Sequence, residues 1–255
     1  MVNLLMRIQR VQFPARQLGG EEWIYQWRLS FLTNTLEKES LGWCRKMIRP
    51  GMVAVDVGAH IGYYTRIFSH LVGSSGRVFS FEPSSENFPV LLKNLSNRRH
   101  KNVTAFNQAV GAKEMLGTLF VSPGHSNHSL NAGFTESVGQ EQVEIVPLDL
   151  VLSQQGISQV DFIKVDVEGS EIRVLNGMRG MIAKSPNLHM LVECNPKALR
   201  AGGFAPMDLL LLIENLGFEA HFILPDGSLR KNIPDALETF NVLCSPAGSG
   251  RFDGV

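Results

Sequence analysis

The sequence predicts an α/β protein with an open, mostly parallel β-sheet that carries helices on both faces. Short runs rich in β-branched residues alternate with segments whose apolar residues recur at helical spacing. The first strong run, residues 52–57, leads into a glycine-containing turn before a helix, which is where an open sheet of this class binds its ligands. A chain of 255 residues is long enough for one such domain with a small additional segment.

The N-terminal segment has helical character, most clearly at residues 21–40. We expect residues 1–50 to form a helical appendage that packs on the sheet or over its cleft, and residues 51–255 to form the main domain. The central strands of that domain are predicted at residues 52–57, 77–82, 102–107, 161–166 and 188–193.

Apolar residues at helical spacing mark the helices between these strands. They are Ile61, Tyr64, Phe68 and Leu71 in the first helix, Phe88, Leu91, Leu92 and Leu95 in the second, and Ile172, Leu175 and Met178 in a later one. Residues 111–147 combine Gly, Ser, Asn and His with two short strand-like runs, which predicts an insertion at one rim of the sheet. Near the C-terminus, two runs around a turn at Asp226-Gly227 predict a final antiparallel pair.

Composition argues against several classes of protein. The chain has 24 basic and 24 acidic residues, so no net charge attracts nucleic acid and we expect no such partner. Its apolar stretches fall short of the run of about 18 residues that suggests a membrane span, and its first residues do not resemble a signal peptide. Cys44, Cys194 and Cys244 lack disulfide or zinc-site spacing, so we expect reduced, partly buried thiols and a cytoplasmic location.

The turn after the first strand has the sequence DVGAHIGYYT. Gly58 and Gly62 permit a tight turn and a close approach of a ligand, and the free N–H groups of the next helix favour a carboxylate or phosphate. The stretch matches neither the G-x-G-x-x-G of dinucleotide-binding proteins nor a phosphate loop that ends in G-K-S/T. Asp56 suits a ligand with an ammonium group beside a carboxylate, such as the methionine part of S-adenosylmethionine. A purely structural glycine turn is the alternative.

Acidic residues end two further strands. Glu82 ends the second strand, where an acidic residue accepts hydrogen bonds from the ribose hydroxyls of an adenosine ligand; a favourable charge at the next helix start is the alternative. Asp166 ends the fourth strand and Glu168 follows it. Beside the first strand, these acids can hold a sulfonium, orient an acceptor hydroxyl or take its proton. Glu171 is expected on a solvated helix turn.

The end of the fifth strand supplies Glu193 and Asn195, which are expected to complete a polar floor. With Asp166 they have oxygen atoms that a divalent cation could use, but we do not expect a required metal. His125 and His128 lie in the presumed substrate loop and titrate near neutral pH, so His128 is a further candidate base. For each histidine alone, an ordinary surface position is the favoured alternative.

Four separated motifs carry a family resemblance. The motifs are VAVDVGAHIGYYT, FSFEPS, VPLDLVL and DFIKVDVEGSEIRVLNGM. In this order and spacing they resemble the FkbM-type methyltransferases, a branch of the Rossmann-like, S-adenosylmethionine-dependent enzymes. The resemblance covers about residues 45–245. It implies a Rossmann-like class I methyltransferase fold, with a seven-stranded, mostly parallel sheet and an antiparallel last strand. It also implies O-methylation of a hydroxyl on a small molecule or sugar, with S-adenosylhomocysteine as the second product.

The resemblance implies site residues by position. The cofactor-binding residues would be Asp56, Gly58, His60, Gly62, Glu82, Pro83, Gln108, Ala109 and Asp166. The glycine turn would frame the methionine part, Glu82 the ribose, and residues 108–109 the adenine. Asp166 and Glu168 would face the transfer site, with His128 as the third catalytic candidate. The family often has asparagine in place of His60, so the role of this histidine stays open.

Three other functions are compatible with parts of the sequence. A nicotinamide-dependent oxidoreductase would share the sheet and the ribose acid, but the third glycine of its fingerprint is missing. A methyltransferase for nucleic-acid bases is disfavoured by the neutral charge and by DVEG, where amino-methylating enzymes have an N-P-P-Y-like turn. A non-catalytic nucleoside-cofactor-binding protein would keep Glu82 and the glycines. A homo-oligomer is compatible with the sequence.

Overall fold

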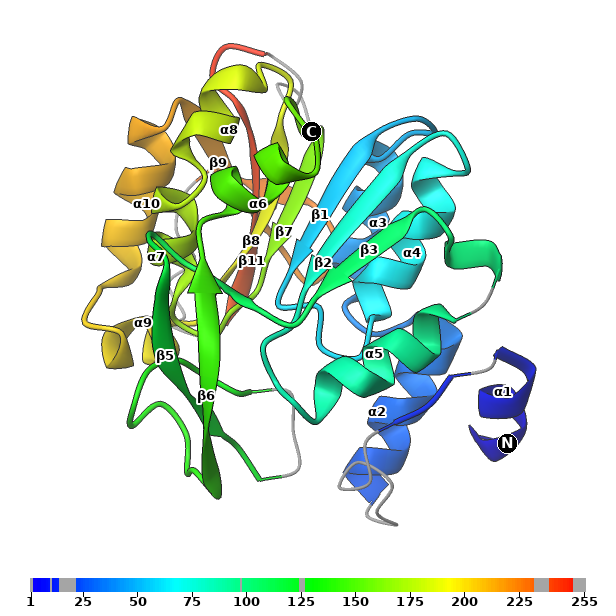
Figure 1. Ribbon diagram of the computed structural model, residues 1–255. Coiled ribbons are helices and arrows are strands. Elements are labelled where there is room, and N and C mark those ends of the chain that lie inside the picture. The colour runs from blue at the N-terminus through cyan, green and yellow to red at the C-terminus, as the bar shows by residue number, and fades with distance from the viewer. Residues whose placement is uncertain are drawn as a thin grey trace.

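A central sheet organises the molecule (Figure 1). The computed structural model describes residues 2–9, 11–13, 22–96, 98–123, 127–231 and 239–249. Eight strands form this sheet in the order β10-β9-β11-β8-β7-β1-β2-β3. They are β1 (Val53–Val57), β2 (Arg77–Phe81), β3 (Val103–Phe106), β7 (Phe162–Val165), β8 (His189–Cys194), β9 (Phe218–Ile223), β10 (Leu229–Arg230) and β11 (Phe240–Pro246). The five central strands predicted from the sequence are β1, β2, β3, β7 and β8, which pair in parallel.

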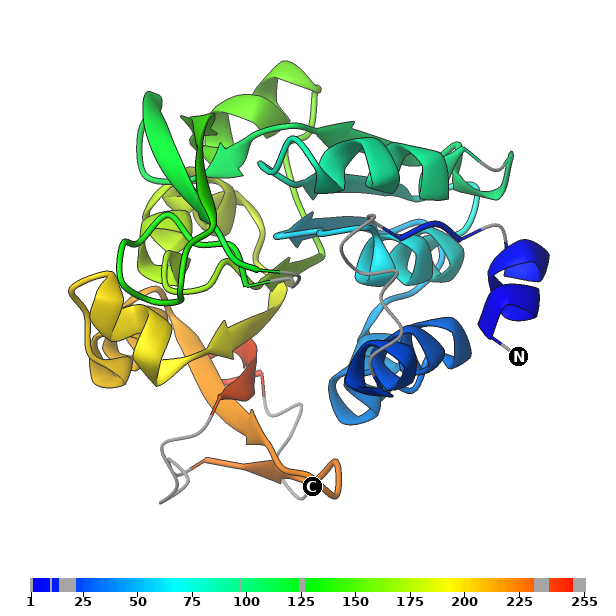
Figure 2. The same cartoon turned by 90° about the horizontal axis from the view of Figure 1, so that it is seen from below.

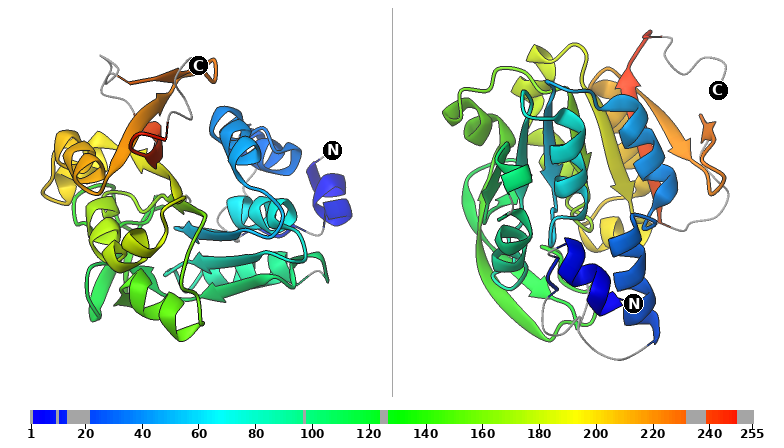
Figure 3. Two further views of the ribbon diagram at one scale, coloured as in Figure 1. Left: turned by 90° about the horizontal axis from the view of Figure 1, so that it is seen from above. Right: turned by 90° about the vertical axis from the view of Figure 1, so that its right-hand side faces the viewer.

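Helices cover both faces of this sheet, as the end-on views in Figures 2 and 3 show. They are α1 (Val2–Gln9), α2 (Glu22–Thr33), α3 (Lys38–Met47), α4 (Tyr63–Val72), α5 (Asn87–Leu95), the 3-10 helix η2 (Arg98–His100), α6 (Leu148–Gln154), α7 (Glu171–Asn176), α8 (Arg179–Lys184), α9 (Pro196–Ala201) and α10 (Pro206–Asn215). Successive residues of β1 face opposite sides, so Val55 and Val57 join one apolar cluster and Ala54 the other. Both clusters consist of buried residues, so the central strands are covered on both faces, which explains their continuous apolar character.

The C-terminal part of the sheet differs from the expected arrangement. The turn at Asp226-Gly227 joins β9 to β10, and this short pair adds an eighth strand to the seven expected. The last strand, β11, then inserts between β9 and β8 and is antiparallel to both. Asp226 favours the tight turn because its Oδ1 accepts a hydrogen bond from the N–H of Ser228 at 2.9 Å. The expected antiparallel pair of final strands is therefore confirmed as β9 and β11, and the short strand β10 after the turn is an addition to it.

The second predicted helix also needs a correction. Leu91 is fully buried, but Leu92 is 47% exposed. Leu92 therefore does not belong to the face that covers the sheet.

The predicted insertion forms a second, three-stranded sheet in the order β4-β6-β5. Its strands are β4 (Ala109–Val110), β5 (Met115–Val121) and β6 (Gly139–Val146), and the last two contain the strand-like runs expected from the sequence. Ala109, Leu119 and Val143 form a small apolar cluster of their own.

The N-terminal helices pack on the sheet, as expected. Phe31 of α2 and Leu41 of α3 are completely buried in the same cluster as Phe68 of α4. Trp43 reaches further and donates its indole N–H to the carbonyl of Gly227 at 2.9 Å. The three cysteines are buried free thiols. Among the described residues, no helix combines the length and apolar character that crossing a bilayer requires.

The turn after β1 packs directly against the end of β7. Gly58 has φ +87°, and a Cβ atom on it would overlap the carbonyl oxygen of Asp166. Any other residue at position 58 would therefore combine a strained backbone with a clash against main-chain atoms, which cannot move aside as the end of a flexible side chain can. The first glycine of the motif is required by the neighbouring strand, whatever ligand binds above it.

We expect Gly58→Ala to lower the free energy of unfolding by more than about 3 kcal/mol or to prevent folding. Gly133→Ala is the matched control, because Gly133 has φ +78° but nothing within 4 Å of an added Cβ. It should lose only the backbone strain of about 1 kcal/mol. Urea denaturation of both variants measures the difference. Equal losses would show that the contact with Asp166 is unimportant.

Candidate functional site

A cavity of about 290 Å³ opens at the carboxyl ends of the central strands. Its position beside β1, with β2 on one side and β7 on the other, is the switch point of the sheet. The predicted site residues that line it are Asp56, Gly58, His60, Glu82, Pro83, Gln108, Ala109, His128, Asp166 and Glu168. The structure thus brings together side chains that are more than a hundred residues apart in the sequence.

Gly62 is the exception among the predicted residues, because it does not line the cavity. It lies at the start of α4 with φ +92°, and a Cβ atom there would come within 2.7 Å of Leu91. The second glycine of the motif therefore serves the turn and the packing of α5. Its glycine is explained by these two constraints without a direct contact to a ligand.

Glu82 joins the ends of β1 and β2. Its Oε2 accepts the N–H of His60 at 2.8 Å, and its Oε1 accepts the N–H of Ser84 at 2.9 Å. The residue is 5% exposed, and burial raises the pKa of its carboxyl to about 7. Each carboxylate oxygen has a second lone pair, so Glu82 can hold the turn and still accept hydrogen bonds from ligand hydroxyls.

Asp56 lies at the floor of the cavity and is 1% exposed. Its Oδ2 accepts the hydroxyl of Thr65 at 2.5 Å. Its buried Oδ1 has no hydrogen-bond partner among the described residues, and burial raises the pKa of this carboxyl. A buried carboxylate oxygen without a donor is costly, so this position favours a ligand with a donor or a positive charge.

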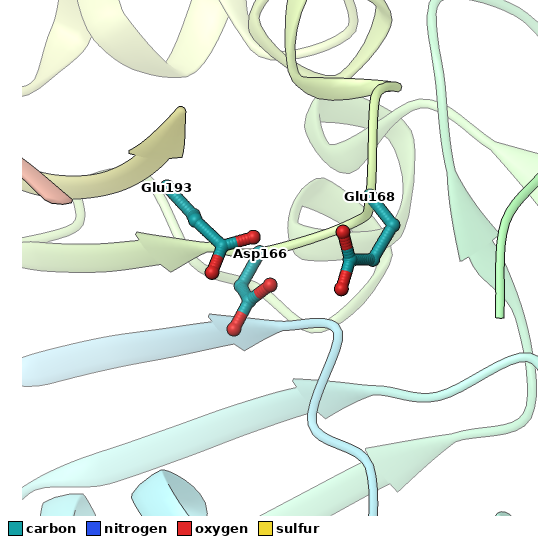
Figure 4. A group of neighbouring side chains, drawn as sticks. All are labelled: Asp166, Glu168 and Glu193. Atoms are coloured by element: carbon teal, nitrogen blue, oxygen red, sulfur yellow. The ribbon is translucent and has the colours of Figure 1, made fainter. Parts of the chain in front are cut away.

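Three carboxylates converge at the ends of β7 and β8 (Figure 4). Asp166, Glu168 and Glu193 each place an oxygen atom within 4.8 Å of the others. We call these residues the acidic cluster. The Oε2 of Glu193 is buried without a hydrogen-bond partner in the described structure. Burial, followed by Asp166, raises the pKa of Glu193 well above its usual value.

The turn that carries Glu168 is held in an unusual conformation. Glu168 has φ +50°, and its carbonyl accepts the hydroxyl of Ser129 from the insertion at 2.6 Å. Its side chain accepts the amide of Asn195 at 3.1 Å. Burial and then the neighbouring Asp166 raise the pKa of this carboxyl to about 8. A non-glycine residue held in the left-handed region is a frequent mark of a functional position.

Glu171 corrects an expectation from the sequence. It is completely buried rather than on a solvated turn, and its Oε1 accepts the N–H of Gly169 at 3.0 Å. Burial raises its pKa to about 7. Glu171 therefore holds the turn below the acidic cluster, because it satisfies a main-chain donor that the tight turn leaves free.

His128 lines the cavity but already uses one ring nitrogen. The N–H of Ser122 lies 3.1 Å from its Nδ1, which places the proton of the neutral ring on Nε2. His125 lies outside the described residues. Gln108 donates its amide to Glu144 of the insertion at 2.9 Å, so it connects β3 to the second sheet.

Two charged residues at the cavity were missed from the sequence. Lys164 is buried and donates to Asp166 at 2.6 Å, with its ammonium 4.5 Å from the centre of the Tyr64 ring. A lysine within an apolar central strand is itself a signal, because a buried charge needs a partner. Glu37 comes from the turn between α2 and α3 and accepts the Tyr64 hydroxyl at 3.0 Å. No sequence pattern marked it.

Aromatic residues of α2 close one side of the cavity. Trp27 and Phe31 line it, and the Trp27 ring lies 5.8 Å from the ring of His60 in an edge-on contact. The N-terminal helices therefore cover the cleft as well as the sheet. They form one wall of the cavity.

The family model and the curated relatives that match this chain are methyltransferases. Residues 56–220 match the family model for the methyltransferase FkbM domain. The 31-O-demethyl-FK506 methyltransferase FkbM of Streptomyces tacrolimicus is 29% identical over 159 residues, which are 51% of this chain and 61% of the relative. Methyltransferase sdnD of Sordaria araneosa is 30% identical over 156 residues, 49% of this chain and 59% of the relative. The matches thus span about three fifths of these relatives.

A solved structure shows the shared fold. The crystal structure of a candidate rRNA methylase from Clostridium thermocellum matches with a TM-score of 0.52 and 11% identity, over 81% of this chain and 95% of that chain. At this low identity the similarity concerns the fold alone. It confirms the predicted Rossmann-like class.

We expect Glu82→Gln to change how stability depends on pH. The pKa of Glu82 is raised from 4.5 to about 7 in the folded protein, so the folded state binds its proton more tightly than the unfolded state. Its contribution is therefore present below pH 4.5 and lost as the pH rises through about 7, a difference of about 3 kcal/mol. Glu82→Gln should flatten the profile by this amount, whereas Glu114→Gln, at an exposed position, should not. Urea denaturation across this range measures both, and identical profiles would contradict the assignment.

Proposed function

The chain belongs to the FkbM methyltransferase family, and on this premise we propose that it transfers the methyl group of S-adenosylmethionine to a hydroxyl of a small molecule or sugar. The observation that carries the proposal is the convergence of acids from the ends of β1, β2 and β7 on one cavity at the switch point of the sheet. Methyl donors of this kind carry an activated methyl group on a positively charged sulfur. An acceptor oxygen can attack this methyl group and displace the sulfur as the leaving group.

The cavity fits this donor in charge. Asp56 Oδ1 and Glu193 Oε2 are buried carboxylate oxygens without hydrogen-bond partners in the described structure. Lys164 neutralises only part of the negative charge of the carboxylates around it. A ligand that brings an ammonium and a sulfonium would supply both the missing donor and the missing positive charge.

Individual residues fit the parts of the donor. Glu82 retains lone pairs for the ribose hydroxyls, and the turn around Gly58 offers backbone close to the methionine part. Gln108 and Ala109 lie where the third strand ends and the insertion begins, a position suited to the adenine. These assignments rest on position within the cavity and, for Glu82, on the lone pairs that its carboxylate keeps for a ligand.

The acceptor oxygen would attack the methyl carbon from the side opposite the sulfur. A carbon–oxygen bond forms, the carbon–sulfur bond breaks, and its electron pair stays on sulfur, which yields S-adenosylhomocysteine. The acceptor proton must leave to a base. Because the methyl group is already activated, alignment and exclusion of water supply most of the rate enhancement, and the α2 aromatics and the insertion serve this purpose.

Among the three candidate bases, Glu168 is the best placed. Asp166 is paired with Lys164 at 2.6 Å, and His128 accepts a main-chain N–H at the nitrogen that would take a proton. Glu168 has a raised pKa and a side chain held by one neutral amide. A carboxylate with a raised pKa is a stronger base than one at its usual value.

We propose that the reaction needs no metal. The oxygen atoms of the acidic cluster are of the type that Mg²⁺ or Ca²⁺ binds. The raised pKa values of Glu168 and Glu193, however, favour protonated carboxyls before a positive ligand arrives. The charge of the donor then takes the place that a divalent cation would otherwise fill.

The test is an assay with methyl-labelled S-adenosylmethionine and a panel of hydroxylated sugars, glycolipid head groups and polyketide-like alcohols. We expect label in one product class, at the same rate with EDTA present, and calorimetric binding of S-adenosylhomocysteine. Glu82→Ala should weaken that binding by more than about tenfold because two charge-assisted hydrogen bonds are lost. Glu114→Ala, at an exposed position, is the matched control.

The outcomes separate the alternatives. Binding of S-adenosylhomocysteine without any transfer would favour a non-catalytic cofactor-binding protein or an acceptor outside the panel. Binding of NADH instead would favour an oxidoreductase. Loss of activity with EDTA that Mg²⁺ restores would contradict the metal-free proposal, and no binding of either ligand would overturn the methyltransferase proposal.

Once an acceptor is known, the pH dependence of kcat/KM tests the base. The pKa of Glu168 is raised to about 8, so the carboxylate form and the rate should increase as the pH rises towards that value. Glu168→Gln should lower kcat by about a hundredfold and remove this alkaline limb. His128→Gln should keep the limb. A limb that persists in Glu168→Gln would exclude Glu168 as the base.

A further inference from the structure

A second cavity, which shares no lining residue with the candidate site, lies at the edge of the sheet where β2 and β3 begin. It is a groove of about 1340 Å³ beside α4 and the η2 turn, which contact each other. Figure 1 shows α4 next to the strands β2 and β3. Six lysine and arginine residues line it: Arg45, Arg66, Arg77, Arg98, Arg99 and Lys101. No aspartate or glutamate is among the described residues that line this groove.

This separation of charge is unusual for the chain. Lys plus Arg and Asp plus Glu each number 24, so a surface without a binding role would mix both signs. Within the described ranges, no ion pair or hydrogen bond engages the side chains of Arg45, Arg66, Arg98 or Lys101. Three of them are exposed, but Arg66 is partly buried, and burial lowers the pKa of its guanidinium. An unpaired guanidinium removed from water favours an anion beside it.

His100 lies among these cations. Its Nδ1 is 2.9 Å from the hydroxyl of Ser69, and Ser69 in turn donates to Asn102 at 2.7 Å. Burial, followed by repulsion from Arg66, Arg99 and His70, lowers its pKa to about 4. The ring therefore reports the positive potential of the groove, because a bound anion would reduce that repulsion and raise the pKa.

We propose that this groove binds an anion that carries more than one phosphate group. Guanidinium groups match phosphate oxygens in pairs, and arginine is the residue of choice for this contact. The cations come from α3, α4, the start of β2 and the η2 segment, so they are spread too widely for one small anion. The phosphates of a soluble oligophosphate and those of an anionic lipid surface offer the same chemistry. The inference does not depend on the proposed methyl transfer, because the groove shares no residue with the candidate site.

The experiment measures binding of tripolyphosphate to the full chain by calorimetry at low and high salt. We expect binding that weakens with salt, and a pKa of His100 that rises by at least about one unit when tripolyphosphate is added, as followed by NMR. Arg98→Glu/Lys101→Glu, at exposed positions, should weaken binding by at least about tenfold. Lys113→Glu/Lys184→Glu is the control, because it makes the same change of net charge at exposed positions outside the groove. Thermal unfolding confirms that each variant is folded.

Co-sedimentation with phosphatidylcholine vesicles, with and without phosphatidylglycerol, distinguishes the two sources of phosphate. Capture by the anionic vesicles, lost in Arg98→Glu/Lys101→Glu, would assign the groove to lipid head groups. Tripolyphosphate binding without such capture would assign it to a soluble ligand. The proposal is overturned if no binding occurs at low salt, or if the control variant loses as much affinity. Tighter binding of a single-stranded RNA oligonucleotide than of tripolyphosphate would replace it with a nucleic-acid surface.

Discussion

The ion pair between Lys164 and Asp166 is the interaction on which the site depends. Lys164 is 2% exposed in a central strand. Burial alone would lower the pKa of its ammonium, but the charges of Asp166, Glu37 and Asp56 outweigh burial and raise this pKa above the usual value. Removal of a buried lysine would leave these carboxylates without compensation, which costs several kcal/mol. The positive charge of Lys164 thus compensates part of the negative charge of the carboxylates at this end of the sheet. Its position opposite Asp56 in the β1–β7 register places it among them.

Lys164 also connects segments that lie far apart in the sequence. It stacks on Tyr64 of α4, the Tyr64 hydroxyl donates to Glu37, and Asn241 of β11 donates to the same carboxylate at 3.3 Å. The N-terminal segment, helix α4 and the last strand therefore meet at one buried network. Such networks define a single arrangement because each polar atom in them is costly to leave unpaired.

The sequence predicted the parts of this protein that local patterns govern. Alternating runs identified the five central strands, and Asp56, Glu82 and Asp166 were found because strand ends meet at one edge of a parallel sheet. The order of β9, β10 and β11 was not predictable, because a turn specifies a hairpin but not which strand inserts beside it. Glu37 and Glu171 were missed or misplaced for a similar reason. Their burial depends on tertiary contacts, whereas their neighbours in sequence look solvated. Lys164 could have been found, because a lysine among apolar strand residues is expected to be buried and a buried charge needs a partner of opposite charge.

The contact between Ser129 and Glu168 limits how the specificity of this protein can change. The insertion supplies a hydroxyl that holds the carbonyl of Glu168, and a Cβ on Gly169 would come within 2.7 Å of the amide of Asn131. The insertion, which lines part of the cavity, therefore also stabilises the turn that carries Glu168. A designer who exchanges residues 111–147 for those of another protein must keep a hydroxyl donor at position 129 and a side chain at position 131 that leaves room for the backbone of Gly169. Otherwise the turn that carries Glu168 would lose the hydrogen bond that stabilises it.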